Sequence, residues 1–182
     1  MAKVLITGAT GFIGNHVTRL CLEKGDDVRV MVMPGEDRSP LDGMDVEFVE
    51  GNLLDPQSLP KTVEGVEQLY HLAAMFSIWT KDPDLHFKIN VDGARAMLRA
   101  AMAANVQKVV FTSSVAAIGI EEGKWSTEET EFNSWPWASS RKMSPRKGTQ
   151  WPQRGERPTT STIRAPNTNL YLDWKFRARL GP

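Results

Sequence analysis

The sequence has a single cysteine, no net charge and no long apolar run. Cys21 has no second cysteine to pair with, so an internal disulfide is excluded. No apolar stretch is long enough to span a bilayer, and the N-terminus lacks the basic and apolar regions of a signal peptide. Lys plus Arg and Asp plus Glu both number 22, which leaves no global field to favour nucleic acid. We therefore expect a cytoplasmic protein with no membrane partner.

Charge and composition divide the chain near Asn133. After this residue the sequence has ten basic residues against two acidic ones, so this segment is net +8 and the rest net −8. Six of the eleven prolines and four of the six tryptophans also lie there, but no valine does. Such a composition is a poor source of sheet layers or core helices. We expect one α/β domain over residues 1–132 and an irregular basic tail, not a native domain, over residues 133–182.

The body alternates short β-branched runs with longer amphipathic stretches, which predicts a parallel sheet covered by helices. Each predicted strand is apolar on both faces or nearly so, as a buried parallel strand requires. The strands are expected at Lys3–Thr7, Val28–Met33, Val46–Val49, Val66–Leu72 and Lys108–Thr112.

Two helices are predicted from apolar residues at helical spacing. The first lies between the first two strands and ends near Gly25; its apolar face comprises Ile13, Val17, Leu20 and Cys21. The second runs from about Asp84 to Ala104, with an inward stripe of Phe87, Val91, Ala94, Leu98 and Ala101. Right-handed crossovers then give a Rossmann-type doubly wound parallel α/β sheet, with helices on both faces and an incomplete C-terminal end.

Three glycines directly follow the first strand, in a loop that reads GATGFIG from Gly8 to Gly14. Glycines at this spacing let the backbone turn tightly and approach a pyrophosphate, whose charge is met by free N–H groups at the helix N-terminus. A glycine triplet alone also occurs in ordinary turns. Its place between a strand and an amphipathic helix favours a dinucleotide site that includes Gly8, Thr10, Gly11, Phe12, Ile13 and Gly14.

The loop "TGATGFIG" resembles the cofactor loop of the extended short-chain dehydrogenase/reductases, the NAD-dependent epimerase/dehydratase group. Further landmarks of that family follow in order: "GNLLD" at Gly51–Asp55, "HLAA" at His71–Ala74, "NVDGARAML" at Asn90–Leu98 and "VVFTSSVAAIG" at Val109–Gly119. The stretch "AAMFSIWTKDP" at Ala73–Pro83 is most similar to the dihydroflavonol-reductase-like and sugar-epimerase-like members. The resemblance implies an NAD(P)-dependent oxidoreductase or epimerase that acts on a carbonyl/hydroxyl or nucleotide-sugar substrate.

The resemblance also implies a role for each landmark. In chain order, it assigns the adenine to Asn52 or Leu53, the nicotinamide ribose to Leu72, Ala73 and Ala74, a structural and proton-relay role to Asn90, cofactor contacts to Thr112 and Ser113, and the active-site serine to Ser114. His71 is open to two interpretations, a buried histidine near the core and a cofactor contact. His16 and His86 have no neighbouring ligands at metal spacing, so no metal site is predicted.

The end of the second strand bears on the choice of nicotinamide cofactor. A carboxylate there binds a ribose 2′-hydroxyl, whereas an arginine there accepts a 2′-phosphate. Val32 stands at the usual acid position, and Met33 stands where reductase-like relatives often have arginine. Arg38 lies a few residues on and could reach a 2′-phosphate, with a solvated loop arginine as the alternative. The absence of a repelling acid gives NAD(P) binding a slight preference for NADP.

The resemblance implies general acid–base catalysis by a tyrosine, whose pKa is lowered by a lysine one helical turn later, in the motif Y-x-x-x-K. Tyr70 lies inside the predicted fourth strand. Tyr171 and Lys175 match the motif literally, but their gap from Ser114 is far longer than the family's usual spacing. We interpret this match as coincidence, so the sequence leaves open whether the chain is an enzyme.

A shifted reading frame near Trp135 to Ser139 is one hypothesis for the unusual tail. Reading Ser140–Gly148 at codons that straddle adjacent residues permits Ser-Lys-Asn-Val-Ala-Glu-Lys, which resembles the S-K-x-x-A-E stretch with the family's catalytic lysine. The same shifted reading gives glycine at the position of the family's catalytic tyrosine. The hypothesis implies a truncated or frame-shifted chain, and a nucleotide sequence with no homologous peptide in the other frames would exclude it.

Two functions are consistent with these residues. The first is an NAD(P)-dependent oxidoreductase or epimerase, whose partners are a nicotinamide dinucleotide and an unidentified small molecule, with a homodimer allowed. The second is a dinucleotide-binding fragment or cofactor sensor without catalysis. No nucleic-acid partner is expected for the basic tail, because its charges are scattered rather than patterned on one helix face.

Overall fold

The computed structural model describes residues 1–77, 82, 84–114, 127 and 130, together with the backbone of three short strands between residues 163 and 180. Contacts divide the chain into two compact units, Met1–Thr112 and Ser113–Pro182. The first unit holds the elements that carry the predicted dinucleotide site. The predicted domain boundary at residue 132 lies outside the described residues.

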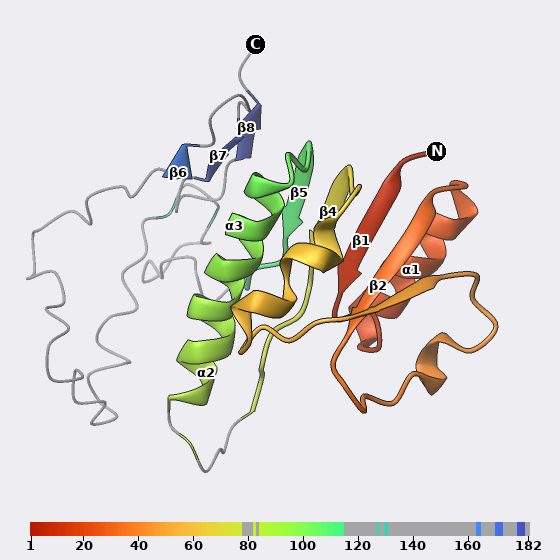
Figure 1. Ribbon diagram of the computed structural model, residues 1–182, viewed down its shortest axis with the longest axis horizontal. Helices are drawn as coiled ribbons and strands as arrows, with labels where there is room; N and C mark the ends of the chain where they lie inside the picture. Colours follow the sequence, from red (N-terminus) through yellow and green to blue (C-terminus); the bar gives the residue numbers. More distant parts are fainter. Residues whose placement is uncertain are drawn as a thin grey trace, which may run out of the picture. The chain divides into compact units, whose positions relative to one another are not determined.

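Five parallel strands form the sheet of the first unit, in the order β3-β2-β1-β4-β5 (Figure 1). Along the chain they are β1 (Lys3–Thr7), β2 (Asp27–Val32), β3 (Glu47–Glu50), β4 (Gln68–His71) and β5 (Lys108–Phe111). The chain moves outward from β1 to β3 and then returns to the other side of β1 for β4. This is the Rossmann order, which confirms the predicted fold class. Ligands of such sheets bind at the carboxyl ends of the strands, beside this reversal of direction.

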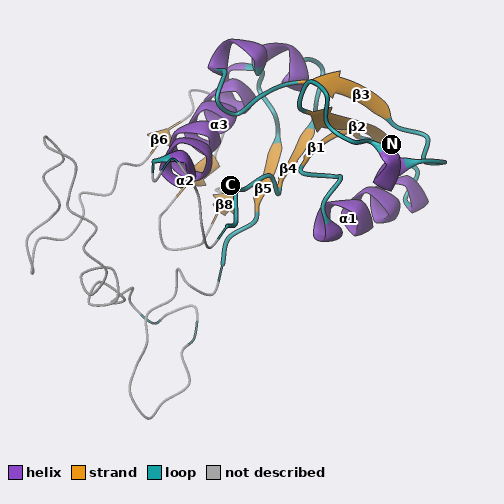
Figure 2. Ribbon diagram, turned by 90° about the horizontal axis from the view of Figure 1, so that it is seen from below, coloured by secondary structure: helices purple, strands orange, loops and turns teal. Residues whose placement is uncertain are grey.

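Helices cover both faces of the sheet, because side chains along each strand point alternately to its two sides. Val4 and Ile6 of β1 pack with Cys21 of α1 (Phe12–Glu23) on one face. Leu5, between them, packs on the other face with Met97 of α3 (Ala94–Ala103). Figure 2 shows α1 and α3 on opposite sides of the strands. The doubly wound arrangement therefore follows from central strands that are buried on both faces, β1 and β2 among them. The outer strands β3 and β5 are mostly exposed, so the prediction that every strand is buried was wrong for these two.

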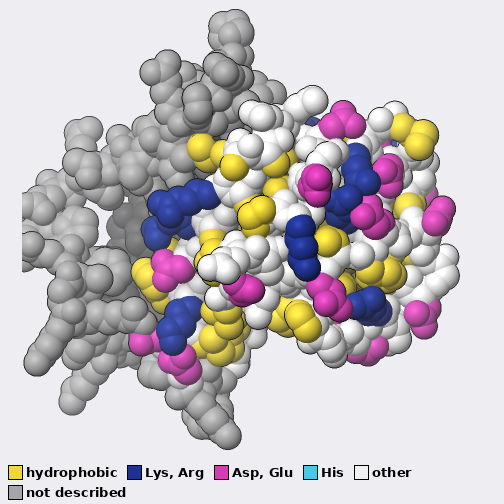
Figure 3. Space-filling view, in the orientation of Figure 1, with side chains coloured by type: hydrophobic (Ala, Val, Ile, Leu, Met, Phe, Trp, Pro, Cys, Tyr) yellow, Lys and Arg dark blue, Asp and Glu magenta, His cyan; other side chains and the backbone are white. Residues whose placement is uncertain are grey.

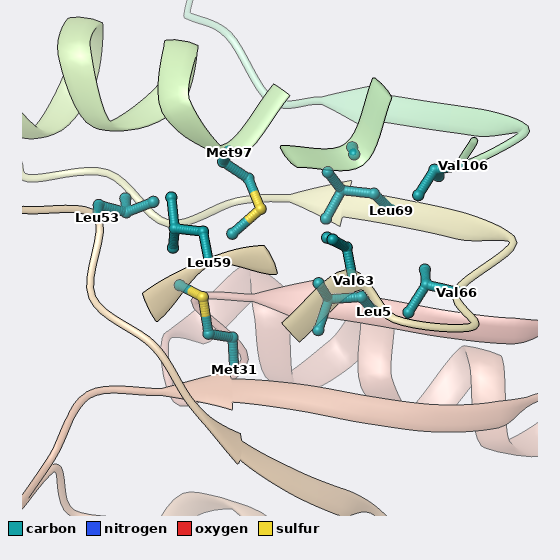
Figure 4. Packing of buried hydrophobic residues seen from close by; sticks show 10 residues of the cluster. Leu5, Met31, Leu53, Leu59, Val63, Val66, Leu69, Met97 and Val106 are labelled. Carbon is teal, nitrogen blue, oxygen red and sulfur yellow. The ribbon is translucent and has the colours of Figure 1, made fainter. Parts of the chain in front are cut away.

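The α3 face contains the larger set of buried apolar side chains (Figure 4). Leu5 and Leu69 of the strands, Leu59 and Met97 are each fully buried. Figure 4 shows Met97 reaching from α3 toward the strands beside Leu59. Leu59 precedes the 3₁₀ turn η3 (Pro60–Val63), which fills the space over the sheet next to α3. Each such side chain contributes roughly 1.5–3 kcal/mol by its removal from water, so this layer holds the sheet and α3 together.

The second predicted helix is continuous but changes its winding. It begins as α2 (Leu85–Phe87), passes through the π-helical segment η4 (Lys88–Gly93) and continues as α3. A π turn takes up one extra residue and so shifts the phase of the apolar face. Ala94 and Ala101 of the predicted stripe are buried, but Phe87 is 41% exposed. The stripe was therefore wrong before the π turn, and it omitted the buried Met97.

The tail carries three short strands, β6 (Ile163–Arg164), β7 (Leu170–Leu172) and β8 (Ala178–Leu180), in an antiparallel sheet of order β6-β7-β8. The composition predicted no sheet layer here. The antiparallel pairing of these two- and three-residue strands therefore differs from that prediction. Ser140–Gly148, on which the frame-shift hypothesis rests, lies outside the described residues.

Candidate dinucleotide site

The loop between β1 and α1 brings backbone against backbone at the carboxyl end of the sheet. Gly8 has a φ of +75°, and a Cβ at this position would lie 2.8 Å from the amide nitrogen of Ala73, the second residue after β4. A Cβ on Gly14 would overlap the carbonyl oxygen of Gly8 and lie 2.7 Å from the Cα of Ala9. Close packing of the loop against its own backbone and that of Ala73 therefore requires glycine at both positions, whereas their predicted contact with a cofactor stays a prediction.

The N-terminus of α1 opens onto the same loop. Gly11 is its N-cap and donates its N–H to the carbonyl of Gly8 at 3.1 Å. No side chain caps the helix, and its first turn carries no acidic residue. Phe12 and Ile13 are 83% and 57% exposed, so their side chains do not bury the N-terminus of α1 in the core. The first-turn N–H groups and the positive end of the helix dipole form a binding place for an anion such as a pyrophosphate.

A buried polar network fixes the ends of β1 and β4 beside this loop. Thr7, the last residue of β1, hydrogen-bonds through Oγ1 to Nδ1 of His71, the last residue of β4, at 2.8 Å. The N–H of Ala73 donates to the same Thr7 oxygen at 3.2 Å. Thr7 and His71 are 0% and 2% exposed. The network sets the position of Ala73 against Gly8, so it defines the floor of the site.

His71 is neutral in this environment. Burial lowers its pKa to about 4 from the ordinary value of 6.5. Its Nε2 atom has no hydrogen-bond partner among the described residues, and its ring lies 5.4 Å from that of Phe111, between centroids. Of the two interpretations left open by the sequence, these contacts support a buried histidine near the core.

The chain after β4 is held by Asn90. Its side-chain amide donates to the carbonyl of Met75 at 2.8 Å and accepts the N–H of Met75 at 2.7 Å. Asn90 lies in η4, so the π-helical segment anchors the residues that follow β4. Leu72 and Ala73 are partly exposed and Ala74 is exposed, which leaves a small-residue surface for a ribose.

The predicted adenine contacts lie in a tight turn after β3. Asn52 accepts the N–H of Leu54 through Oδ1 at 2.9 Å and donates its own N–H to Oγ of Ser58 at 2.9 Å. The Leu53 side chain is 8% exposed and belongs to the core on the α3 side. A Cβ on Gly93 would lie 2.7 Å from the Cβ of Leu53, so the turn packs closely on η4. Leu53 thus offers its backbone, rather than its side chain, to a ligand.

Two charged residues after β2 differ from the sequence interpretation. Arg38, considered for a 2′-phosphate, pairs with Glu50 at 3.2 Å and lies over the Phe48 ring, with 5.1 Å from Cζ to the centroid. Glu36, which sequence reasoning missed, accepts the Thr10 hydroxyl at 2.6 Å and the Met33 N–H at 2.7 Å. The signal that could have found it is the Pro-Gly turn that precedes it.

The predicted catalytic residues belong to the second unit, and the predicted cofactor contacts Thr112 and Ser113 are the last residue of the first unit and the first residue of the second. Thr112 closes the first unit and donates its N–H to the carbonyl of His71 at 3.0 Å. Ser113 and Ser114 begin the second unit and are exposed. Tyr171 lies in β7, paired in register with Arg164 and Arg179, whereas Lys175 lies outside the described residues. The roles of Ser114, Tyr171 and Lys175 stay predictions.

Charges are mixed on the face that Figure 3 shows, and one hollow lies away from the predicted site. Figure 3 shows one face on which Lys and Arg alternate with Asp and Glu, without a patch of one sign. A hollow of about 900 Å³ lies at the amino ends of β2 and β3, beside Asp27 and Glu47, and contains none of the predicted site residues. Among the described residues no group of three His, Cys, Asp or Glu could hold a metal ion, and no helix is long and apolar enough to cross a membrane.

The Rossmann strand order, the glycine loop at its reversal and the uncapped helix N-terminus are the features of Rossmann-type dinucleotide-binding domains. The family model of the NAD dependent epimerase/dehydratase family matches residues 4–163. The chain belongs to this family.

Individual relatives agree with this assignment. Over 124 residues, 68% of this chain, the sequence is 42% identical to sterol demethylase protein B of Methylococcus capsulatus. It is 38% identical over 116 residues, 64% of this chain, to a putative dihydroflavonol 4-reductase of Synechocystis sp.. The crystal structure of the Thermus thermophilus UDP-glucose 4-epimerase in complex with NAD is similar with a TM-score of 0.63 and 28% identity, over 72% of this chain.

The matches cover less than half of each of these relatives. The aligned part is 38% of the Methylococcus protein, 34% of the Synechocystis protein and 44% of the Thermus chain. The similarity to the Synechocystis reductase and the Thermus epimerase confirms the dihydroflavonol-reductase-like and epimerase-like resemblance. The stretch that carried it includes residues 78–81 and 83, which lie outside the described residues.

Proposed function

We propose that this chain binds a nicotinamide dinucleotide over the carboxyl ends of β1 and β4, as the cofactor-binding part of an NAD(P)-dependent oxidoreductase or epimerase. The observation that carries the proposal is the uncapped N-terminus of α1, which follows a glycine loop packed directly on the backbone of Ala73 at the carboxyl end of the sheet. Free N–H groups at such a helix N-terminus bind the pyrophosphate of a dinucleotide in Rossmann sheets.

Each part of the site has a task in this proposal. The dinucleotide, when bound, supplies a nicotinamide ring that accepts or donates hydride. The first-turn amides of α1 bind the pyrophosphate, and the loop held by Asn90 and the Thr7 network positions the backbone of Ala73 beneath the nicotinamide ribose. The neutral His71 adds no positive charge beneath the bound cofactor.

The substrate class follows from the family rather than from a described pocket. The printed functions of the relatives include a dihydroflavonol 4-reductase and a UDP-glucose 4-epimerase, which supports a carbonyl/hydroxyl or nucleotide-sugar substrate. Ser114 is the residue proposed to orient the substrate carbonyl. A cytoplasmic location, a homodimer and the choice between NAD and NADP stay predictions at this level.

Binding is tested by titrating the full chain with NADH and following the fluorescence of the nicotinamide. Gly8→Ala and Gly25→Ala are matched variants, because both glycines have positive φ, +75° and +79°, but only Gly8 has atoms within 4 Å of the added Cβ. We expect saturable binding by the natural sequence and by Gly25→Ala, and binding at least about tenfold weaker in Gly8→Ala. Equal affinities of the two variants, or no binding by the folded natural chain, would contradict the proposal.

Turnover separates an enzyme from a binding fragment. Oxidation of NADH is followed in the presence of a panel of aldehydes and ketones, with epimerisation of UDP-sugars as a second assay. Tyr171→Phe should leave any turnover unchanged, because we interpret the Tyr171 and Lys175 match as coincidence. Binding without turnover would favour the second candidate, a cofactor-binding fragment or sensor.

A further inference from the structure

The residues directly after β2 form a tight turn. Met33, Pro34, Gly35 and Glu36 occupy its four positions, and the N–H of Glu36 donates to the carbonyl of Met33 at 3.1 Å. Proline at the second position and glycine with a φ of +76° at the third are the signature of a type II turn. The turn returns the chain toward the end of the strand it has just left.

The side chain of Glu36 completes this return. One carboxylate oxygen accepts the Met33 N–H at 2.7 Å and the other accepts the Thr10 hydroxyl at 2.6 Å. Thr10 belongs to the glycine loop after β1, so a single carboxylate joins the end of β2 to the loop that cradles the pyrophosphate. Glu36 is partly exposed, which leaves its remaining lone pairs open to a ligand on the solvent side.

The cation that could oppose this carboxylate is directed elsewhere. Arg38 pairs with Glu50 of β3 at 3.2 Å and lies over Phe48 of the same strand. The neighbouring acid, Asp37, accepts the N–H and hydroxyl of Ser39, both at 2.9 Å, and so serves the next turn. Among the described residues that follow β2, Glu36 is thus the charged residue that hydrogen-bonds to the glycine loop.

We propose that Glu36 selects NAD over NADP at this site, by accepting a hydroxyl of the adenosine ribose and repelling a 2′-phosphate. The inference rests on the proposed function, since it needs the dinucleotide to lie over the glycine loop. A carboxylate with free lone pairs binds a ribose hydroxyl well, whereas a phosphate at the same place brings two like charges within a few ångström. Val32 and Met33 carry no acid, and the turn supplies one from four residues beyond the strand.

The position of the Glu36 carboxylate removes the reason for the expected slight preference for NADP. That expectation depended on the absence of a repelling acid at the end of β2, and on Arg38 as a ligand for phosphate. The turn brings the Glu36 carboxylate to that strand end, and the Arg38 guanidinium contacts Glu50 and Phe48.

The test is a pair of titrations, with NADH and with NADPH, of the full chain and of two variants. Glu36→Gln removes the charge but keeps one oxygen to accept the Met33 N–H, while its NH₂ group can donate to the Thr10 hydroxyl oxygen. Asp37→Asn removes the same charge one residue away and is the matched control. We expect the natural chain and Asp37→Asn to bind NADH roughly tenfold or more tightly than NADPH, and Glu36→Gln to lose most of this ratio through tighter NADPH binding.

A second measurement does not depend on the variant. Because the discrimination is between charges, the NADPH to NADH ratio of dissociation constants of the natural chain should fall as NaCl is raised from about 0.05 M to about 0.5 M. Equal affinities for the two nucleotides, or a ratio that Glu36→Gln and Asp37→Asn alter alike, would overturn the role of Glu36 while dinucleotide binding stands. Failure to bind either nucleotide would overturn the proposed function, and this inference with it.

Discussion

His71 shows how one buried side chain can shape the whole candidate site. Its Nδ1 shares the Thr7 hydroxyl with the amide of Ala73, at 2.8 and 3.2 Å. A polar group buried without partners costs about 1–3 kcal/mol, so removal of Thr7 would leave both partners unpaired where β1 and β4 meet the glycine loop. The network therefore stabilises the strands and the floor of the site together.

The first residue-scale prediction concerns pH. Burial lowers the pKa of His71 to about 4 from 6.5, so between these values the unfolded chain binds a proton that the folded chain does not. The contribution of His71 to the free energy of unfolding is intact above about pH 6.5 and falls as the pH decreases toward 4, by roughly 3 kcal/mol in total.

Urea unfolding of the natural chain and of His71→Gln, each from pH 7 to pH 4, measures this effect. Glutamine keeps polar atoms for Thr7 but cannot gain a proton in this range. The natural chain should lose more stability than the variant as the pH falls. Parallel pH profiles of the two proteins would show that His71 does not titrate as its burial requires.

Residue identity alone was enough to predict some of the site and not the rest. The glycines could be predicted because close backbone packing leaves a sequence trace that no other residue satisfies. Glu36 could not, because its position depends on a turn that brings a later residue back to the strand end. Arg38 was a reasonable candidate from its place in the loop, but Glu50 on the neighbouring strand was not visible in the local sequence.

At the scale of elements, the helix from Leu85 to Ala103 carries the most consequential irregularity. Its π-helical segment, Lys88–Gly93, contains both Asn90, which binds the backbone of Met75, and Gly93, which packs on Leu53. One element thus holds the loop after β3 and the loop after β4. The inserted residue of a π turn is often found at functional sites, which agrees with this double contact.

Asn90→Ala should therefore act on stability and on binding together. The variant loses two hydrogen bonds to Met75, of 2.7 and 2.8 Å, which we expect to lower the free energy of unfolding by roughly 1–3 kcal/mol. It should also weaken NADH binding, since the loop after β4 is no longer held under the nicotinamide. The urea midpoint and an NADH titration measure the two effects.

Asp92→Ala is the control on the same segment. Asp92 forms an exposed pair with Arg95 at 3.1 Å, and such pairs contribute about 0–1 kcal/mol. The control should keep both stability and affinity close to those of the natural chain. If Asn90→Ala behaves like Asp92→Ala in both measurements, the clamp on Met75 has no role in the site.

Element type was predictable where the chain has a regular period, and element phase was not. All five parallel strands were predicted, because each contains apolar or β-branched residues in a short segment bounded by turn residues. The fourth was expected over Val66–Leu72 but occupies Gln68–His71, since its apolar run continues beyond the ladder with its neighbours. The π turn leaves no pattern in the sequence, so the predicted apolar stripe was wrong at Phe87, before that turn.

At the scale of the molecule, the order of the elements and landmarks in the first unit agrees with the family that the match over residues 4–163 shows. The glycine loop, the turn after β3 and the Asn90 helix occur in the expected order, and they meet at the carboxyl ends of the strands of one sheet. The tail could not be predicted in the same way, because its composition has no period of two or 3.6 residues over a length that buries a face. Its three short strands are a backbone arrangement that composition does not encode.

The most direct test of the central claim is where NADH binds. Amide chemical shifts of the ¹⁵N-labelled 20.3 kDa chain are recorded with and without NADH. We expect the largest changes in amide chemical shift at Gly8, Gly11, Gly14, Ala73 and Met75. We expect none at Gly25 or Gly43, which lie in turns with open space around them. Changes confined to other amides, or none at saturating NADH, would contradict a dinucleotide seated over the carboxyl ends of β1 and β4.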